Sequence, residues 1–160
     1  MPSEKNIEKT NVMRILDQKK IPYQSHCYLT SGAVSAVDLA AALGEDPAHV
    51  FKTLVTVGKS GANYVFMVPA AEELHLKKAA AAVGEKSIEM IKSKELLPLT
   101  GYIHGGCSPI GMKKRFPTYL DPSAFQYDII AVSAGQRGVQ VLLSPNDLAA
   151  FVGAKTVDLM

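Results

Sequence analysis

A lysine stands among apolar residues in the segment at 50–55, which reads VFKTLV. If this segment is a β-strand, alternation of side chains places Lys52 on one face with Val50 and Leu54. Phe51 and Thr53 then lie on the opposite face. A cation held on such a face can bind a phosphate or stabilise a developing oxyanion. The alternative is a lysine near a strand start whose ammonium extends into water, and the pattern alone leaves both interpretations open.

A glycine-rich loop, GGCSPIG at 105–111, follows a short predicted strand at 102–104. The consecutive glycines Gly105 and Gly106 allow backbone N–H groups to approach a ligand and to point at an anion or a carbonyl oxygen. Pro109 stiffens the far side of the loop. An ordinary turn has the same composition, so the sequence leaves two interpretations of this loop, an oxyanion site and a plain turn.

Nucleophilic catalysis by the protein is not favoured. Cys107 lies three residues after His104, but working Cys/His pairs are usually adjacent in space and not along the chain. No Ser/His/Asp order suggests a triad, and no HExxH motif is present. The two cysteines, Cys27 and Cys107, lack CxxC spacing, so a zinc site is not expected. We expect neither a metal nor another cofactor.

The segment SAGQRG at 133–138 joins two predicted strands. It could present the Ser133 hydroxyl and the Arg137 guanidinium to a ligand, or it could be a plain hairpin turn. The basic runs at 19–20, 77–78 and 113–115 could contact RNA phosphates, although such runs are more often solvated faces.

Composition places the chain among globular proteins. It has 160 residues, of which 48% are hydrophobic and 20% are charged, and this excludes intrinsic disorder. No repeat or long linker divides it, so we expect a single domain over residues 1–160. The apolar runs are too short to span a bilayer, and the first ten residues lack an apolar signal segment, so a cytoplasmic location is expected. The net charge of +2 is too small to grip nucleic acid by charge alone.

Periodicity and capping signals predict the elements that must position these residues. The predicted helices begin after a cap at Thr10, at Ser35, at Glu72 and at Ser93, and a last one opens at Ser144. The predicted strands cover 23–28, 50–57, 63–68, 102–104, 118–121, 128–133 and 139–143. Strict strand–helix alternation and phosphate-binding loops are missing, so the prediction is a mixed α/β fold with a barrel-like sheet surrounded by helices.

Taken together, these segments resemble the YbaK family. The matching phrases are IPY at 21–23, FKTLV at 51–55, LKKAA at 76–80, GYIHGGCSPIG at 101–111, KKR at 113–115, VSAGQRG at 132–138 and SPNDL at 144–148. The family consists of bacterial aminoacyl-tRNA deacylases related to the editing insertion domain of prolyl-tRNA synthetase. The resemblance extends from about residue 9 to residue 159, and it implies a mixed, barrel-like sheet with outer helices.

The resemblance implies hydrolysis of the ester in mischarged tRNA, chiefly cysteine attached to the proline tRNA. Cysteine and proline are similar in size, and a size-based pocket separates near-isosteres poorly. The family is thought to use the thiol of the substrate as nucleophile, and such an intramolecular attack depends mainly on orientation. The implied partners are aminoacyl-tRNA, namely tRNA(Pro), and prolyl-tRNA synthetase in a transient complex.

The resemblance also assigns roles to residues. Lys52 matches the lysine expected to hold the 3′-terminal adenosine and its phosphate, with Phe51 and Thr53 beside it in the substrate site. The loop from Gly105 through Gly106 to Pro109 matches the GxxxP loop, whose backbone N–H groups would receive the ester carbonyl oxygen. The remaining positions assigned to substrate binding are Tyr28, Ser133 and Arg137.

Two departures and three rival functions accompany this assignment. Cys107 occupies a variable position of the loop, so its thiol is expected to be incidental, and Ala134 replaces a commoner glycine. The rivals are a deacylase of another mischarged tRNA such as Ala-tRNA(Pro), a non-catalytic tRNA- or synthetase-binding module, and a cell-envelope factor. Retention of Lys52 together with the glycine loop argues against the module, and the missing export signal argues against the envelope factor.

Overall fold

The computed structural model describes residues 9–27, 49–136 and 138–160. Its helices are α2 (Asn11–Gln18), α4 (Leu76–Val83), α5 (Ser93–Thr100), the 3₁₀-helix η2 (Pro122–Gln126) and α6 (Pro145–Val152). Its strands are β1 (Gln24–Cys27), β2 (Phe51–Gly58), β3 (Asn63–Pro69), β4 (Ile88–Met90), β5 (Thr118–Leu120), β6 (Ile130–Ser133), β7 (Val139–Leu143) and β8 (Lys155–Thr156). Three predicted features lie outside the described residues: Tyr28, Arg137 and the helix opening at Ser35.

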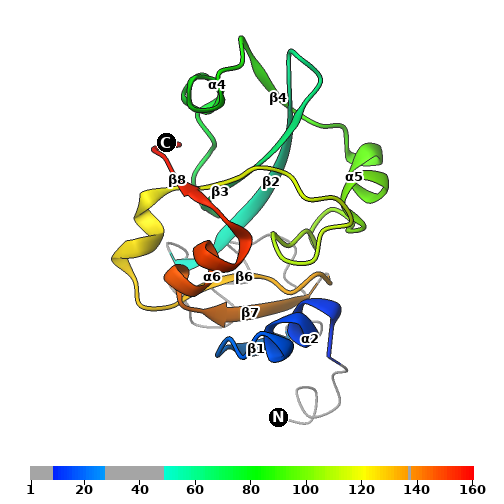
Figure 1. Cartoon of the computed structure of the whole chain (residues 1–160), viewed down its shortest axis with the longest axis vertical. Helices are drawn as coiled ribbons and strands as arrows, with labels where there is room; N and C mark the ends of the chain where they lie inside the picture. Colours follow the sequence, from blue (N-terminus) through cyan, green and yellow to red (C-terminus); the bar gives the residue numbers. More distant parts are fainter. Residues whose placement is uncertain (1–8, 28–48, 137) are drawn as a thin grey trace.

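The strands form two sheets that meet at one point (Figure 1). The three-stranded sheet has the order β1-β7-β6 and is antiparallel throughout. The five-stranded sheet has the order β4-β2-β3-β5-β8 and is mixed, since β5 pairs in parallel with both β3 and β8. A parallel bridge between Val50 and Ala131 joins them. The predicted mixed α/β class is therefore confirmed, whereas the described strands do not close into a barrel.

The strongest local sequence signals correspond to real helix starts. Thr10 caps α2 by accepting a hydrogen bond from the Met13 N–H through its hydroxyl, and Ser144 caps α6 by accepting one from the Asp147 N–H. Serine and threonine stabilise a helix start in this way because they satisfy an amide that has no partner within the helix. The β2–β3 hairpin also forms with its turn at the predicted position. These predictions are confirmed.

Two predicted elements are wrong. The helix predicted from Glu72 begins only at Leu76, because His75 serves as N-cap and its own N–H donates to Leu159 O. The predicted strand at 102–104 is irregular, because the Tyr102 N–H donates to the Thr100 hydroxyl and not to a neighbouring strand. The short strands β4 and β8 were not predicted.

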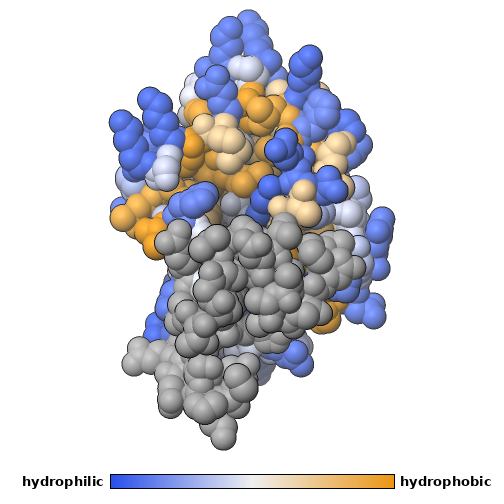
Figure 2. Space-filling view, turned by 180° about the vertical axis from the view of Figure 1, so that it is seen from behind, coloured by the Kyte–Doolittle hydropathy of each residue, from blue (hydrophilic) through white to orange (hydrophobic). Residues whose placement is uncertain are grey.

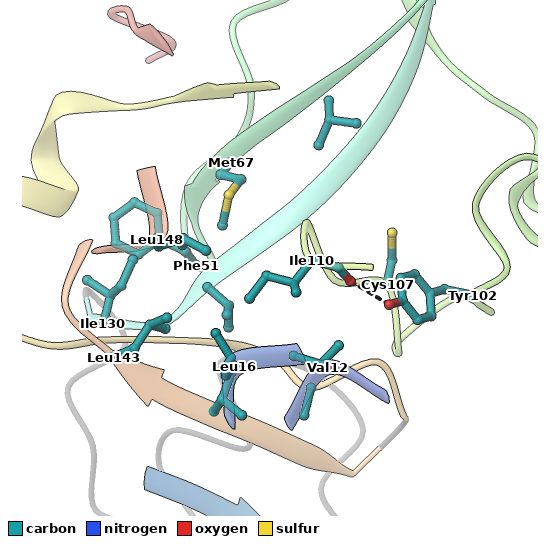
Figure 3. Close-up of a cluster of buried hydrophobic side chains, with 14 of the residues drawn as sticks. Val12, Leu16, Phe51, Met67, Tyr102, Cys107, Ile110, Ile130, Leu143 and Leu148 are labelled. Atoms are coloured by element: carbon teal, nitrogen blue, oxygen red, sulfur yellow. Dashed lines mark hydrogen bonds between the residues drawn. The ribbon is translucent and has the colours of Figure 1, made fainter. Parts of the chain in front are cut away.

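The main hydrophobic core lies between α2, α6 and the facing sides of both sheets (Figure 1, Figure 3). Val12 and Leu16 of α2 meet Phe51 of β2 and Ile130 of β6 there, and Ile110 enters from the glycine-rich loop. Burial of such side chains contributes about 1.5–3 kcal/mol each. The core therefore fixes β2, β6 and the loop relative to one another.

A second core lies on the other face of the β2–β3 hairpin. Phe66 and Val68 of β3 pack there with Ala79 and Ala80 of α4. The view from behind shows apolar surface in the upper half of the molecule with hydrophilic side chains around it (Figure 2). Leu76 of α4 is 41% exposed. Helix α4 therefore carries an exposed apolar side chain as well as the two buried alanines of the second core.

Two carboxylates hold the periphery of the five-stranded sheet. Asp121 is buried and accepts hydrogen bonds from the Leu159 N–H and the Ser123 N–H, both at 3.0 Å, which fastens the C-terminal segment. Glu85 accepts hydrogen bonds from the Ser60 N–H and hydroxyl and from the Tyr64 hydroxyl. The Ser60 and Tyr64 hydrogen bonds lower the pKa of Glu85. Glu85 thus closes the β2–β3 turn.

No helix in the described residues is long and apolar enough to cross a membrane.

Candidate active site

The bridge between the two sheets brings Lys52 and Ser133 to neighbouring positions. Val50 and Ala131 are paired in parallel, so two residues further along each chain β2 carries Lys52 and β6 carries Ser133. Both residues are partly buried. The main core holds Ile130 and Val132 from the other face of β6, and alternation therefore places Ser133 on the face away from that core. Lys52 and Ser133, which are 81 positions apart in the sequence, therefore lie near the bridge on the same face of the two strands.

The neighbours of Lys52 along β2 face the other way. Phe51 is 2% exposed and packs in the main core (Figure 3). Strand alternation places it on the opposite face of β2 from Lys52. Thr53 follows the same alternation, and its Oγ1 is buried without a hydrogen-bond partner in the described part of the chain. Core packing accounts for Phe51, so the structure does not bring these two predicted substrate contacts to the face that carries Lys52.

The glycine-rich loop is anchored by its own hydrogen bonds. The Gly106 N–H donates to Ile103 O at 3.0 Å, and the Ile110 N–H donates to the Ser108 hydroxyl at 3.2 Å. Gly105 has φ +88°, a left-handed conformation that glycine adopts without steric cost. Pro109 is buried. The loop therefore has a fixed shape, and the Gly106 amide is already used within it.

Tyr102 connects this loop to the turn that follows Ser133. Its hydroxyl donates to Ile110 O across the loop (Figure 3). A Cβ added at Gly135, where φ is +88°, would lie 2.9 Å from Tyr102 Cε1, so only glycine lets the turn approach this ring. The Gly135 N–H in turn donates to the Ser133 hydroxyl at 3.3 Å. The loop and the β6–β7 turn therefore lie against one another, with Ser133 at the start of that turn.

Cys107 is not poised as a nucleophile. Its side chain is buried beside Tyr102 and Ile110 in the main core (Figure 3). Burial raises the pKa of the Cys107 thiol from 9.0 to about 12, so the thiolate is rare at neutral pH. His104 is exposed to solvent. Both observations agree with the prediction that this thiol is incidental.

Gln140 is a buried polar residue that no motif in the sequence singles out. It is only 3% exposed, and its Oε1 has no hydrogen-bond partner within residues 9–27, 49–136 and 138–160. In the β6–β7 register it lies directly opposite Ser133, so the two side chains share one face. Its position between Val139 and Val141 could have indicated this face, but the alternation alone does not show that the face is covered.

The remaining predicted contacts lie at the surface. Lys113, Lys114 and Arg115 are exposed. The Lys113 N–H donates to Thr100 O, which holds this basic run against the end of α5. Among the described residues, no group of three or more His, Cys, Asp or Glu side chains could hold a metal ion.

Comparison with known proteins identifies the family. The model of the aminoacyl-tRNA editing domain matches residues 30–151. A protein of Enterococcus faecalis named "Putative Cys-tRNA(Pro)/Cys-tRNA(Cys) deacylase EbsC" is 45% identical over 160 residues, which cover 99% of this chain and 98% of that protein. The chain therefore belongs to the aminoacyl-tRNA editing domain family.

Two further relatives connect the chain with prolyl-tRNA synthetase. The proline–tRNA ligase of Shouchella clausii is 30% identical over 109 residues, which cover 68% of this chain and 19% of the ligase. A solved structure described as "a putative trans-editing enzyme for prolyl tRNA synthetase" has a TM-score of 0.82 and 27% identity, and the match covers 96% of this chain and 98% of that one. The predicted family is confirmed, and with it the enzyme class of aminoacyl-tRNA deacylases.

Proposed function

We propose that the chain removes a wrongly attached amino acid from tRNA by cleaving the aminoacyl ester, and that Cys-tRNA(Pro) is its principal substrate. It acts in trans beside prolyl-tRNA synthetase in the cytoplasm. The observation that carries the proposal is the juxtaposition of Lys52 and Ser133 at the junction of the sheets. The similarity to the EbsC protein over nearly the whole chain supports the choice of cysteinyl esters.

Lys52 holds the tRNA 3′ end in this proposal. Its ammonium binds the phosphate of the terminal adenosine, which places the ester over the neighbouring end of β6. There the Ser133 hydroxyl, whose oxygen already accepts the Gly135 N–H, retains its own hydrogen for donation to the substrate. Tyr28 and Arg137 complete the aminoacyl pocket by their match to the family motif, and Thr53 supports β2 beneath it.

Backbone amides of the glycine-rich loop stabilise the oxyanion. The Gly106 N–H is used by Ile103 O, so its glycine serves to shape the loop. The amides of Gly105 and Cys107 make no hydrogen bond to the described residues, and Pro109 holds the far side of the loop. These two N–H groups donate hydrogen bonds to the ester carbonyl oxygen as it gains negative charge. Donors that are fixed in advance stabilise the transition state in this way.

The nucleophile in this proposal is the thiol of the cysteine substrate. The thiol loses its proton to solvent, its sulfur bonds to the ester carbonyl carbon, and the bond from that carbon to the ribose oxygen breaks. The ribose oxygen takes up a proton, which leaves free tRNA and a cyclic thiolactone. Orientation of the thiol over the carbonyl supplies most of the rate enhancement. The buried, protonated Cys107 takes no part.

The synthetase supplies tRNA identity. A net charge of +2 gives the chain little general attraction for nucleic acid, so discrimination of tRNA(Pro) requires a second RNA-binding surface. The chain matches only 19% of a proline–tRNA ligase, which is consistent with an editing unit that works beside a larger enzyme. We propose a transient complex.

Deacylation of Cys-tRNA(Pro), Cys-tRNA(Cys) and Ala-tRNA(Pro) by the purified chain, with and without prolyl-tRNA synthetase, tests the proposal. We expect loss of both cysteinyl esters by the chain alone, persistence of the alanyl ester, and restriction to tRNA(Pro) when the synthetase is added. Ser-tRNA(Pro), in which oxygen replaces sulfur, is the control for the thiol mechanism and should persist. Preferential attack on the alanyl ester would support the rival deacylase, and no turnover of any ester would leave a binding module.

A further inference from the structure

The buried amide oxygen of Gln140 lacks the partner that such an atom normally has. Gln140 is 3% exposed, and its Oε1 makes no hydrogen bond to any residue that the structure describes. Buried polar atoms in folded proteins are nearly always hydrogen-bonded, and an exception has a cause such as local strain, a bound water or ion, or a role in catalysis. An amide oxygen is purely an acceptor, so the missing group is a donor.

Gln140 lies in line with the two residues that define the proposed site. Ser133 of β6 is paired with Gln140 of β7, and the Val50–Ala131 bridge places Lys52 of β2 beside Ser133 on the other side. Adjacent paired strands are about 4.8 Å apart, which is the spacing between Ser133 and Gln140, and the row continues from Ser133 towards Lys52 past the isolated bridge. β7 is the middle strand of its sheet, and Gln140 is also paired with His26 of β1. A substrate that extends from Lys52 to Gln140 therefore has its two ends at these residues and stops short of β1.

The surroundings decide which end lies where. The small apolar cluster of Val50, Ala131 and Leu142 lies beside the whole row on the same face, so it does not distinguish the two ends. Charge does distinguish them, because the cation of Lys52 attracts the phosphate of the terminal adenosine. The group that reaches Gln140 therefore belongs to the aminoacyl moiety.

The α-amino group is the donor that fits best. A protonated amine offers three N–H donors and forms charge-assisted hydrogen bonds, which are about twice as strong as neutral ones. The thiol of cysteine is only a weak donor, and this proposal uses it for attack on the ester. We propose that Gln140 Oε1 accepts a hydrogen bond from the free α-amino group of the substrate and so selects unmodified aminoacyl esters. This inference rests on the proposed function.

The experiment combines a change in the protein with a change in the substrate. Gln140→Met keeps the length of the side chain and removes the acceptor, and 3-mercaptopropionyl-tRNA(Pro) keeps the thiol and ester but lacks the amine. Each enzymatic rate is divided by the spontaneous rate for the same ester, because the amine also alters ester reactivity. The control is Gln126→Met, which changes an exposed glutamine of η2.

We expect Gln140→Met to lower kcat/KM for the cysteinyl ester by about 10- to 150-fold, the range for a hydrogen bond to a charged group. Removal of the amine should lower the wild-type value by a similar factor. The variant and the wild type should then hydrolyse the mercaptopropionyl ester equally, and the control variant should match the wild type on both esters.

Several results would overturn the inference while leaving the proposed function intact. One is a wild-type protein whose normalised kcat/KM is the same for the cysteinyl and the mercaptopropionyl ester. Another is a Gln140→Met variant whose kcat/KM for the cysteinyl ester is unchanged. The third is a Gln140→Met variant that loses the same factor on both esters. Thermal unfolding provides a second test, because removal of an unsatisfied buried polar atom should leave the melting temperature at or above that of the wild type. A variant that melts earlier or fails to fold would assign Gln140 a structural role. If the wild type cleaves no ester at all, the proposed function fails as well.

Discussion

Replacement of Cys107 by alanine should leave turnover intact and change the response of the fold to alkaline pH. Burial raises the pKa of the thiol from 9.0 to about 12 in the fold. The folded state therefore keeps its proton while the unfolded chain loses it, and stability falls as pH rises from 9 towards 12. At pH 10 the loss relative to neutral pH is about 1.4 kcal/mol, from the two pKa values. At pH 7 only about one thiol in 10⁵ is ionised in the fold.

Urea unfolding of wild type and Cys107→Ala at pH 7.5 and pH 10 measures this difference. We expect the variant to be about 1 kcal/mol less stable at pH 7.5, because a small buried group has been removed. At pH 10 it should equal or exceed the wild type. Other titrating groups cancel in the comparison apart from Tyr102, whose pKa is raised mainly by burial and in smaller part by Cys107. A constant difference at both pH values would refute the assigned pKa, and a large fall in deacylation by a folded variant would restore Cys107 as the nucleophile.

Three further changes test contacts of the fold. Asp121→Ala removes the acceptor of the Leu159 N–H and should cost about 3 kcal/mol in urea unfolding, whereas Asp121→Asn, which keeps one oxygen, should lose less. The pKa of Glu85 is lowered, so its hydrogen bonds to Ser60 stabilise the turn above pH 4.5 and are lost as the pH falls below that value. Hydrogen exchange of the Ser60 amide measures this loss, and in Glu85→Gln the exchange should no longer show it. Tyr102→Phe should lower the free energy of unfolding by about 1–2 kcal/mol, because the hydrogen bond to Ile110 O is lost. In the wild type, the tyrosinate absorbance of Tyr102 should appear only near pH 12, because burial raises its pKa to about 12.

Features that depend on neighbours in the chain could be predicted from the sequence. Thr10 and Ser144 cap their helices because each hydroxyl reaches an amide three residues ahead. The β2–β3 hairpin forms because two strands rich in branched residues flank a glycine turn. Such signals require no knowledge of distant segments.

Features that depend on distant contacts could not be predicted. The start of α4 is set by the hydrogen bond of His75 to Leu159, 84 residues away in the chain. The segment after Tyr102 resembles a strand in composition, but the hydroxyls of Thr100 and Tyr102 replace the pairing of a strand. The short strand β8 exists only because β5 lies beside it.

The candidate site was predicted in part for the same reason. The strand pattern placed Lys52 on one face of β2, and the structure confirms that Phe51 and Thr53 lie on the other. The meeting of Lys52 with Ser133 depends on the Val50–Ala131 bridge between two sheets, which no local pattern reveals. Gln140 is found only from its burial and its vacant acceptor.

The role of Lys52 in holding the tRNA 3′ end is tested by the rate of cysteine release from Cys-tRNA(Pro) by wild type, Lys52→Ala and Lys59→Ala under single-turnover conditions. Lys59, at the exposed turn of the same hairpin, is the matched control. We predict a loss of at least about 100-fold for Lys52→Ala, because a charge-assisted phosphate contact and the orientation that it gives are both removed. The circular dichroism of that variant should not change, and Lys59→Ala should retain the wild-type rate. Full activity in a folded Lys52→Ala protein would contradict the account.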